Sequence, residues 1–225
     1  MIELFTTAFV TFFVAIDPPG VAPIFGALTN GSSAAHRRAM AIKSVVIATG
    51  VLLGFALIGG WLLGALHISL DAFRAAGGVL LFMMALDMIF EKRTERREER
   101  AEKLSEEDDT IPGTHEDISV FPMAIPMLAG PGSIATMMLL MSDPQNTGLL
   151  SKAVILGSAG INLLLCLVIF LAIGPIMRFI GDSIAAMITR ILGVILAALA
   201  AQFIFDGIRG GLLEGGAHIA VSALS

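Results

Sequence analysis

The sequence predicts an all-α membrane protein: six transmembrane helices arranged as two inverted three-helix repeats, the first helix of each repeat broken at a Pro/Gly motif. Hydrophobic residues make up 56% of the chain, the mean hydropathy is +0.87, and only 15% of residues are charged. A soluble domain this apolar would aggregate. Two further observations give the architecture, namely a set of apolar stretches of membrane-spanning length and a pair of motifs that recurs in both halves.

The apolar stretches each approach the roughly 20 residues that a helix needs to cross a bilayer. They cover residues 4–28, 44–66, 73–90, 118–141, 153–177 and 184–205. The first begins at MIELFTTAFV, which has no basic n-region and no evident cleavage site, so we expect it to remain as a span. The single cysteine, Cys166, lies within the fifth stretch and is expected to be a small buried hydrophobe.

The third and fourth stretches are separated by a charged segment, residues 91–117. It contains 6 of the 14 basic and 11 of the 19 acidic residues, and therefore accounts for the whole net charge of -5. We expect a solvated linker, either helical or disordered, and no nucleic-acid partner, because no basic face with interleaved aromatic residues is present. The predicted organisation is repeat 1 over 1–90, the linker over 91–117, repeat 2 over 118–210 and a C-terminal tail over 211–225.

The distribution of Lys and Arg predicts the orientation of the spans. Eleven basic residues fall on one side and three on the other; the three are Arg74, Lys152 and Arg209. Since the cytoplasmic side carries the excess, we expect a bacterial inner-membrane protein with both termini outside the cytoplasm and the linker inside it.

The two halves share motifs in the same order. A shift of 112 positions aligns DPPGVAP with AGPGSIA, and matches Pro19 with Pro131 and Gly20 with Gly132. Further along, RAAGGVLLF and RILGVILAA share an arginine followed by a glycine three residues later. Because each copy holds an odd number of spans, the second copy must enter the membrane from the opposite side, as in many secondary transporters.

Each break is predicted to start a new half-helix. Asp17 is a candidate N-cap before Pro18 and Pro19, and Gly130 precedes Pro131 in a similar way. The first amide groups of such a helix lack intrahelical partners and favour an anion, and the glycines let a ligand approach the backbone. The alternative interpretation is a pair of ordinary proline kinks packed by neighbouring helices.

The polar residues near the breaks fit a small zwitterion. The candidate substrate-binding residues are Asp17, Pro19, Gly20, Gly130, Pro131, Gly132, Ser133, Thr136 and Asn162. The candidate proton-coupling residues are Asp17, Asp87 and Asp206, the last two with solvated capping at span ends as the alternative. No cluster of His, Cys and carboxylate residues indicates a metal, and no cofactor is expected.

The segments DPPGVAPIF, FPMAIPMLAGPGSIATM and FRAAGGVLLFMMALDMIF resemble the signature segments of the MarC family (UPF0056), which includes the SnatA small neutral amino acid transporters. The resemblance covers nearly the whole chain outside the linker. It implies a six-span inner-membrane protein with two inverted repeats and, for SnatA-like members, proton-coupled transport of glycine, alanine and similar substrates. Members often have asparagine at the position of Asp17, so the resemblance does not imply that Asp17 is a proton-binding site shared by the family.

The predicted function is therefore secondary transport of a small neutral amino acid by alternating access, without enzymatic activity. The alternatives are a channel or exporter for another small solute and, less favoured, an intramembrane hydrolase with Asp17 in an acidic pair. Arg74 and Arg190 occupy equivalent repeat positions and are expected to anchor span ends, with a gating salt bridge as the alternative. The sequence leaves open whether the protein forms a homo-oligomer in the bilayer.

Overall fold

The computed structural model describes residues 1–90, 117–174 and 182–222, and every described element is helical. The elements are α1 (Ile2–Ile16), α2 (Pro18–Leu28), α3 (Ala34–Ala65), α4 (Leu70–Ile89), η1 (Ser119–Leu128), α6 (Pro131–Ser142), η2 (Pro144–Asn146), α7 (Leu149–Leu171) and α9 (Asp182–Ser222). The predicted linker, apart from Asp117, and the end of the fifth apolar stretch lie outside the described residues.

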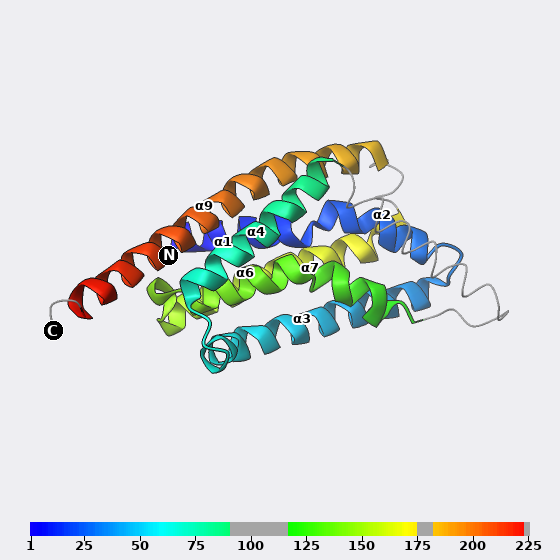
Figure 1. Cartoon of the computed structure of the whole chain (residues 1–225). Helices are drawn as coiled ribbons and strands as arrows, with labels where there is room; N and C mark the ends of the chain where they lie inside the picture. Colours follow the sequence, from blue (N-terminus) through cyan, green and yellow to red (C-terminus); the bar gives the residue numbers. More distant parts are fainter. Residues whose placement is uncertain (91–116, 175–181, 223–225) are drawn as a thin grey trace.

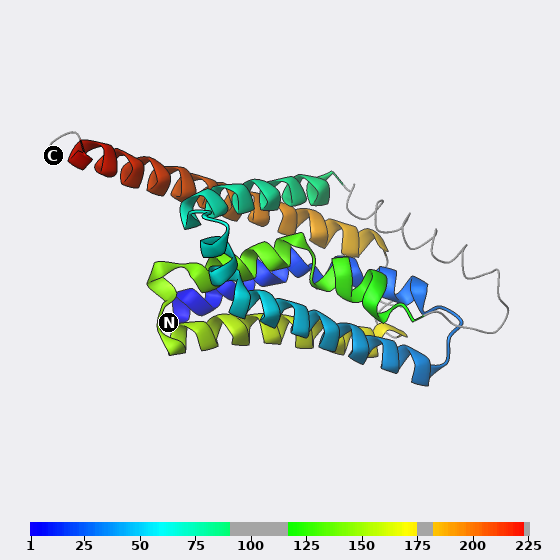
Figure 2. The same cartoon turned by 60° about the horizontal axis from the view of Figure 1, so that its bottom comes forward.

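The long helices run back and forth along one bundle (Figure 1). Among the described residues, five helices are long and apolar enough to cross a membrane, and the pair η1 and α6 makes a sixth if its 54° bend is counted within one span. The α1–α2 pair counts as one span of 27 residues. Both termini lie at the same end of the bundle in Figures 1 and 2.

Capping residues explain where two of the helices begin. Ser33 and Ser69 each precede a helix, and their side chains accept hydrogen bonds from the amides of His36 and Ala72. Such caps satisfy amides that a helix start leaves without partners. The cap at Ser33 starts α3 ten residues before the apolar stretch that begins at residue 44, so the helix is longer than hydropathy indicates.

The last helix also exceeds its predicted length. The sequence predicts a span ending near residue 205 and a separate tail over 211–225, whereas α9 continues to Ser222. It packs along the whole of α4, and the two helices cross closely at small residues. A Cβ on Gly207 would lie 2.5 Å from the Ala75 nitrogen and 2.6 Å from the Asp71 carbonyl oxygen, so glycine is needed for this contact. Figure 2 shows α4 and α9 side by side.

The broken first span lies inside the bundle. In its most apolar window 72% of residues are buried, against 22–39% for the other four candidate spans. Buried Phe25 of α2 stacks on Phe170 of α7 with 4.3 Å between ring centroids. The two halves of the first span contact α7, whereas η1 and α6 contact α3. The first span therefore lies inside the bundle together with α6, of whose 12 residues 8 are buried, whereas the four other candidate spans leave apolar faces for lipid.

Candidate functional site

The first break is a single residue, Asp17, which ends α1 and begins α2. Its backbone is left-handed (φ 59°, ψ 63°), a conformation that aspartate and asparagine tolerate better than other non-glycine residues. The side chain is 1% exposed. Its Oδ1 accepts a hydrogen bond from the Gly20 amide at 3.2 Å and from the Thr189 hydroxyl at 3.1 Å. Asp17 is thus the predicted N-cap, and it also joins α2 to α9.

The residues after Asp17 complete this cap. Pro18 and Pro19 have no amide hydrogen to leave without a partner, and the Gly20 amide, the first one available, points to Asp17. A Cβ on Gly20 would overlap the Asp17 carboxylate, so the glycine makes room for the cap. The amino end of α2 is therefore closed by a carboxylate of its own chain.

The second break has no such cap. Gly130 precedes Pro131 at the start of α6, and within the described residues this helix has no side-chain cap hydrogen bond. The preceding helix η1 contains two extended residues, Phe121 and Ile125, each placed directly before a proline that disfavours helical geometry at its predecessor. A Cβ on Gly130 would overlap the Pro126 carbonyl oxygen, so glycine is required for the bend. The amino end of α6 therefore lacks the side-chain cap that closes the amino end of α2.

The structure gives Gly132 a packing role that the sequence interpretation did not anticipate. We expected glycines at both breaks to let a ligand approach bare backbone. Instead, a Cβ on Gly132 would overlap the Met84 sulfur of α4. A larger residue at Gly132 would therefore disturb the packing of α6 against α4.

Three other predicted site residues are buried polar groups with atoms that lack partners. Ser133 and Thr136 lie on α6, and Asn162 lies on α7; each is at most 1% exposed. The Ser133 Oγ, Thr136 Oγ1 and Asn162 Oδ1 atoms have no hydrogen-bond partner within the part of the chain that the structure describes. The Asn162 amide group does have partners, since Nδ2 donates to the carbonyls of Phe9 at 3.1 Å and Ser158 at 2.9 Å. Because α1, α6 and α7 contact one another, these atoms belong to the interior of the bundle.

The remaining predicted site residues are less enclosed. Pro19 is partly buried in the first turn of α2, whereas Pro131 is exposed. Asp87 and Asp206 are both partly buried, Asp87 close to the end of α4 and Asp206 on the stretch of α9 beside the start of α4. The two acids therefore lie toward opposite ends of the bundle.

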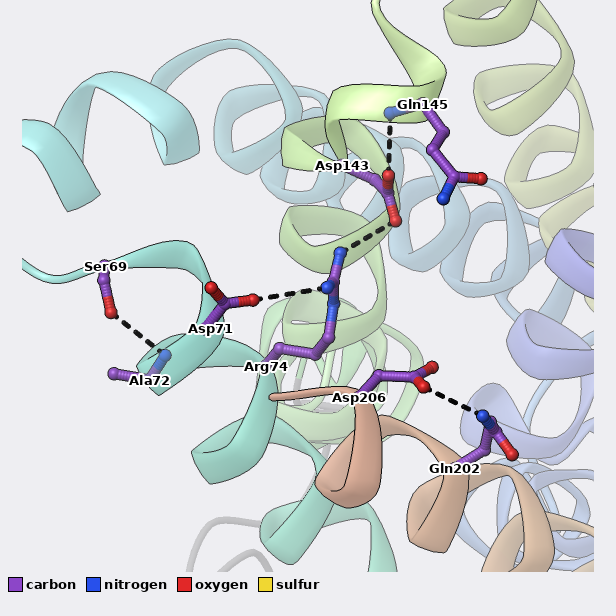
Figure 3. Close-up of polar contacts among 8 residues, drawn as sticks. All are labelled: Ser69, Asp71, Ala72, Arg74, Asp143, Gln145, Gln202 and Asp206. Carbon is purple, nitrogen blue, oxygen red and sulfur yellow. Dashed lines mark hydrogen bonds and ion pairs between the residues drawn. The ribbon is translucent and has the colours of Figure 1, made fainter. Parts of the chain in front are cut away.

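A polar cluster surrounds the start of α4 (Figure 3). Arg74 donates to Asp143 at 2.9 Å and to Asp71 at 3.4 Å, and ties α4 to the segment after α6. Asp206 accepts a hydrogen bond from Gln202 at 2.9 Å, a bond within α9. Arg74 thus anchors a span end through an ion pair that joins the two halves of the chain.

A second ion pair lies at the opposite end of the bundle, and its acid, Asp117, precedes the fourth span. Lys43 donates to Asp117 at 2.9 Å, and Asp117 also accepts from the amide and hydroxyl of Ser119 at the start of η1. The Ser119 hydroxyl and then Lys43 stabilise the charged carboxylate, and lower the pKa of Asp117 from 3.8 to about 2.

Sequence reasoning missed Thr189, whose buried hydroxyl contacts Asp17 from 172 positions away. The available signal was a lone hydroxyl next to Arg190 in an otherwise apolar span. The assembled interior offers one carboxylate and several uncharged oxygen atoms, and the described residues hold no group of three or more His, Cys, Asp or Glu side chains suited to a metal.

These features define a multi-pass integral membrane protein with polar groups enclosed among its spans. The model of the MarC family integral membrane protein matches residues 2–212, and the chain belongs to this family. A UPF0056 membrane protein of Methanocaldococcus jannaschii is 34% identical over 94% of this chain and 99% of its own length. The UPF0056 membrane protein YvbG of Bacillus subtilis is 32% identical over 93% of this chain and 96% of its own length. No solved structure matches the chain.

Proposed function

We propose that this chain is a secondary transporter of small neutral amino acids, of the size of glycine and alanine, coupled to protons. The observation that carries the proposal is the set of buried oxygen atoms on Ser133, Thr136 and Asn162 that lack partners among the described residues. An unsatisfied buried polar group costs about 1–3 kcal/mol, so three within one bundle indicate a site that a ligand completes.

The charges around the breaks favour a zwitterion. A substrate carboxylate suits the amino end of α6, because this end has no side-chain cap and carries the positive end of the helix dipole. Asp17 supplies the negative charge for an ammonium group, and its burial makes it the first candidate for proton coupling, with Asp87 and Asp206 as the others. The buried hydroxyls of Ser133 and Thr136 lie on the first turns of the same helix and could bond the polar groups of such a substrate.

The packing supports two inverted repeats around this site. The broken first span packs on α7, the middle span of the second half, and the broken fourth span packs on α3, the middle span of the first half. The α1–α2 pair runs away from the end of the bundle that holds the termini, and the η1–α6 pair runs toward it (Figure 1). Alternating access then follows from movement of one repeat against the other. We place the termini outside the cytoplasm of a bacterial inner membrane, as the basic residues indicate.

The first test is a thermal-stability screen of the purified protein in detergent against all neutral amino acids. We expect glycine or alanine to raise the unfolding temperature, and stabilisation by none of the neutral amino acids would refute the substrate assignment. Ser133→Ala and Thr136→Val should weaken this effect and leave the free protein as stable as before or more so, since each removes an unsatisfied group. Ser44→Ala is the matched control, because the Ser44 hydroxyl is buried but already donates to the Met40 carbonyl.

Flux measurements separate the alternatives. In proteoliposomes, a transporter should show saturation and counterflow of labelled glycine or alanine. Flux without counterflow would indicate a channel, and a chemically altered product would indicate a hydrolase. An exporter for another small solute would leave amino acid flux at the level of empty liposomes, and sizing in detergent would show whether the unit is a homo-oligomer.

A further inference from the structure

A pocket lies between the start of α3 and the end of α7, at the end of the bundle opposite the termini. Its volume is about 430 Å³, and the residues that line it are Ala34, Arg37, Arg38, Phe170, Leu171 and Gly174. Among the described residues, the lining combines two guanidinium groups with apolar side chains and includes no acid. Figures 1 and 2 both show the start of α3 and the end of α7 at this end of the bundle.

The two arginines of the pocket have no acidic partner among the described residues. Arg37 is half-buried and reaches toward α7, where a Cβ on Gly174 would lie 3.9 Å from its Nη1 atom. Its Nε atom is buried without a hydrogen-bond partner among the described residues. Neither Arg37 nor Arg38 forms an ion pair within the part of the chain that the structure describes. A buried guanidinium donor without a partner indicates a missing acceptor.

The start of α3 adds to the positive potential. Ser33 caps the His36 amide, whereas Ala34, which lines the pocket, belongs to the first turn whose amides have no intrahelical partner. The positive end of the helix dipole and two arginines thus converge on one space. Planar guanidinium groups bind phosphate oxygens in pairs of hydrogen bonds, which makes phosphate the anion that this arrangement suits best.

We propose that this pocket binds the phosphate group of an anionic phospholipid. Phosphate chemistry alone is shared with soluble phosphates, but the apolar side chains of Phe170 and Leu171 beside the arginines suit the glycerol and acyl region of a lipid. A basic pocket between transmembrane helices, at the end where basic residues concentrate, is a recognised setting for lipid headgroups. The site is separate from the breaks at Asp17 and Gly130 and does not depend on the proposed transport function.

The test measures lipid binding to the purified full-length protein by native mass spectrometry in an uncharged detergent. We expect phosphatidylglycerol to bind at least tenfold more tightly than phosphatidylcholine. Arg37→Gln combined with Arg38→Gln should weaken phosphatidylglycerol binding about tenfold or more, because each change removes a charge-assisted hydrogen bond. Arg209→Gln is the matched control, since it removes an equal charge from an exposed position on α9 and should leave binding within about twofold.

Arg37→Lys keeps the charge but loses the Nε donor, so it should bind phosphatidylglycerol more weakly than the natural protein even if the double variant does not fold. Equal binding by Arg37→Lys and the natural protein would refute the guanidinium site, and equal loss in Arg209→Gln would show attraction by net charge alone. A thermal shift with millimolar inorganic phosphate and none with phosphatidylglycerol would overturn the lipid assignment in favour of a soluble phosphate.

Discussion

Replacement of Asp17 tests the central feature of the first break. This buried residue has a left-handed backbone between α1 and α2, caps α2, and accepts a hydrogen bond from Thr189. Asp17→Ala should lose all three contributions. A left-handed backbone costs an alanine about 1–2 kcal/mol. Loss of the N-cap bond to Gly20 costs about 1 kcal/mol, and loss of the Thr189 bond about 0.6 kcal/mol inside a membrane protein. The expected destabilisation is therefore about 3 kcal/mol.

Asp17→Asn is the matched variant, because asparagine tolerates the same backbone, caps nearly as well and offers Thr189 an oxygen. It should cost less than about 1 kcal/mol. Asp17→Gly separates the backbone contribution from the hydrogen-bond contributions. Glycine adopts the left-handed backbone without strain but still loses the Thr189 bond, so the stability of this variant should fall between those of the alanine and asparagine variants.

The assay is equilibrium unfolding in mixed micelles with increasing SDS, followed by circular dichroism. If the alanine and asparagine variants unfold at the same SDS fraction, the capping and backbone argument is refuted. The same asparagine variant also tests coupling. If transport takes place, it should survive in Asp17→Asn with a changed dependence on pH, and an unchanged pH profile would remove Asp17 from the coupling step.

Three more predictions test other contacts. Gly207→Ala should destabilise the protein by about 1–3 kcal/mol in the same unfolding assay, because its Cβ would press on the α4 backbone. Gly50→Ala should not, because the added Cβ would meet no described side chain or neighbouring helix within 4 Å. The lowered pKa of Asp117 adds stability that is fully present above pH 3.8 and is lost as the pH falls to about 2, so Asp117→Asn should flatten the acid side of the stability profile, and an equally steep profile would contradict the ion pair. In a cysteine-free background in intact cells, Gln145→Cys should react with an impermeant thiol reagent and Ser105→Cys should not; the reverse pattern would invert the orientation.

The sequence by itself determined the class of protein, the approximate spans and the positions of both breaks. Hydropathy and helix-breaking chemistry are local properties, so the apolar stretches and the Pro/Gly motifs at Asp17 and Gly130 mark where helices cross and where they stop. The sequence also places Ser133, Thr136 and Asn162 within apolar spans, but only the structure shows that all three are buried and do not face lipid.

Tertiary structure decided what each break does, because the partners lie far away along the chain. Thr189 reaches Asp17 across 172 positions and Arg74 reaches Asp143 across 69, distances over which no local pattern specifies a contact. Packing likewise gives Gly132 a neighbour in Met84 and extends α9 beyond its apolar stretch. The two breaks look alike in sequence, yet one is closed by its own carboxylate and the other lacks a side-chain cap, since only the fold determines which groups meet the first amides of a helix.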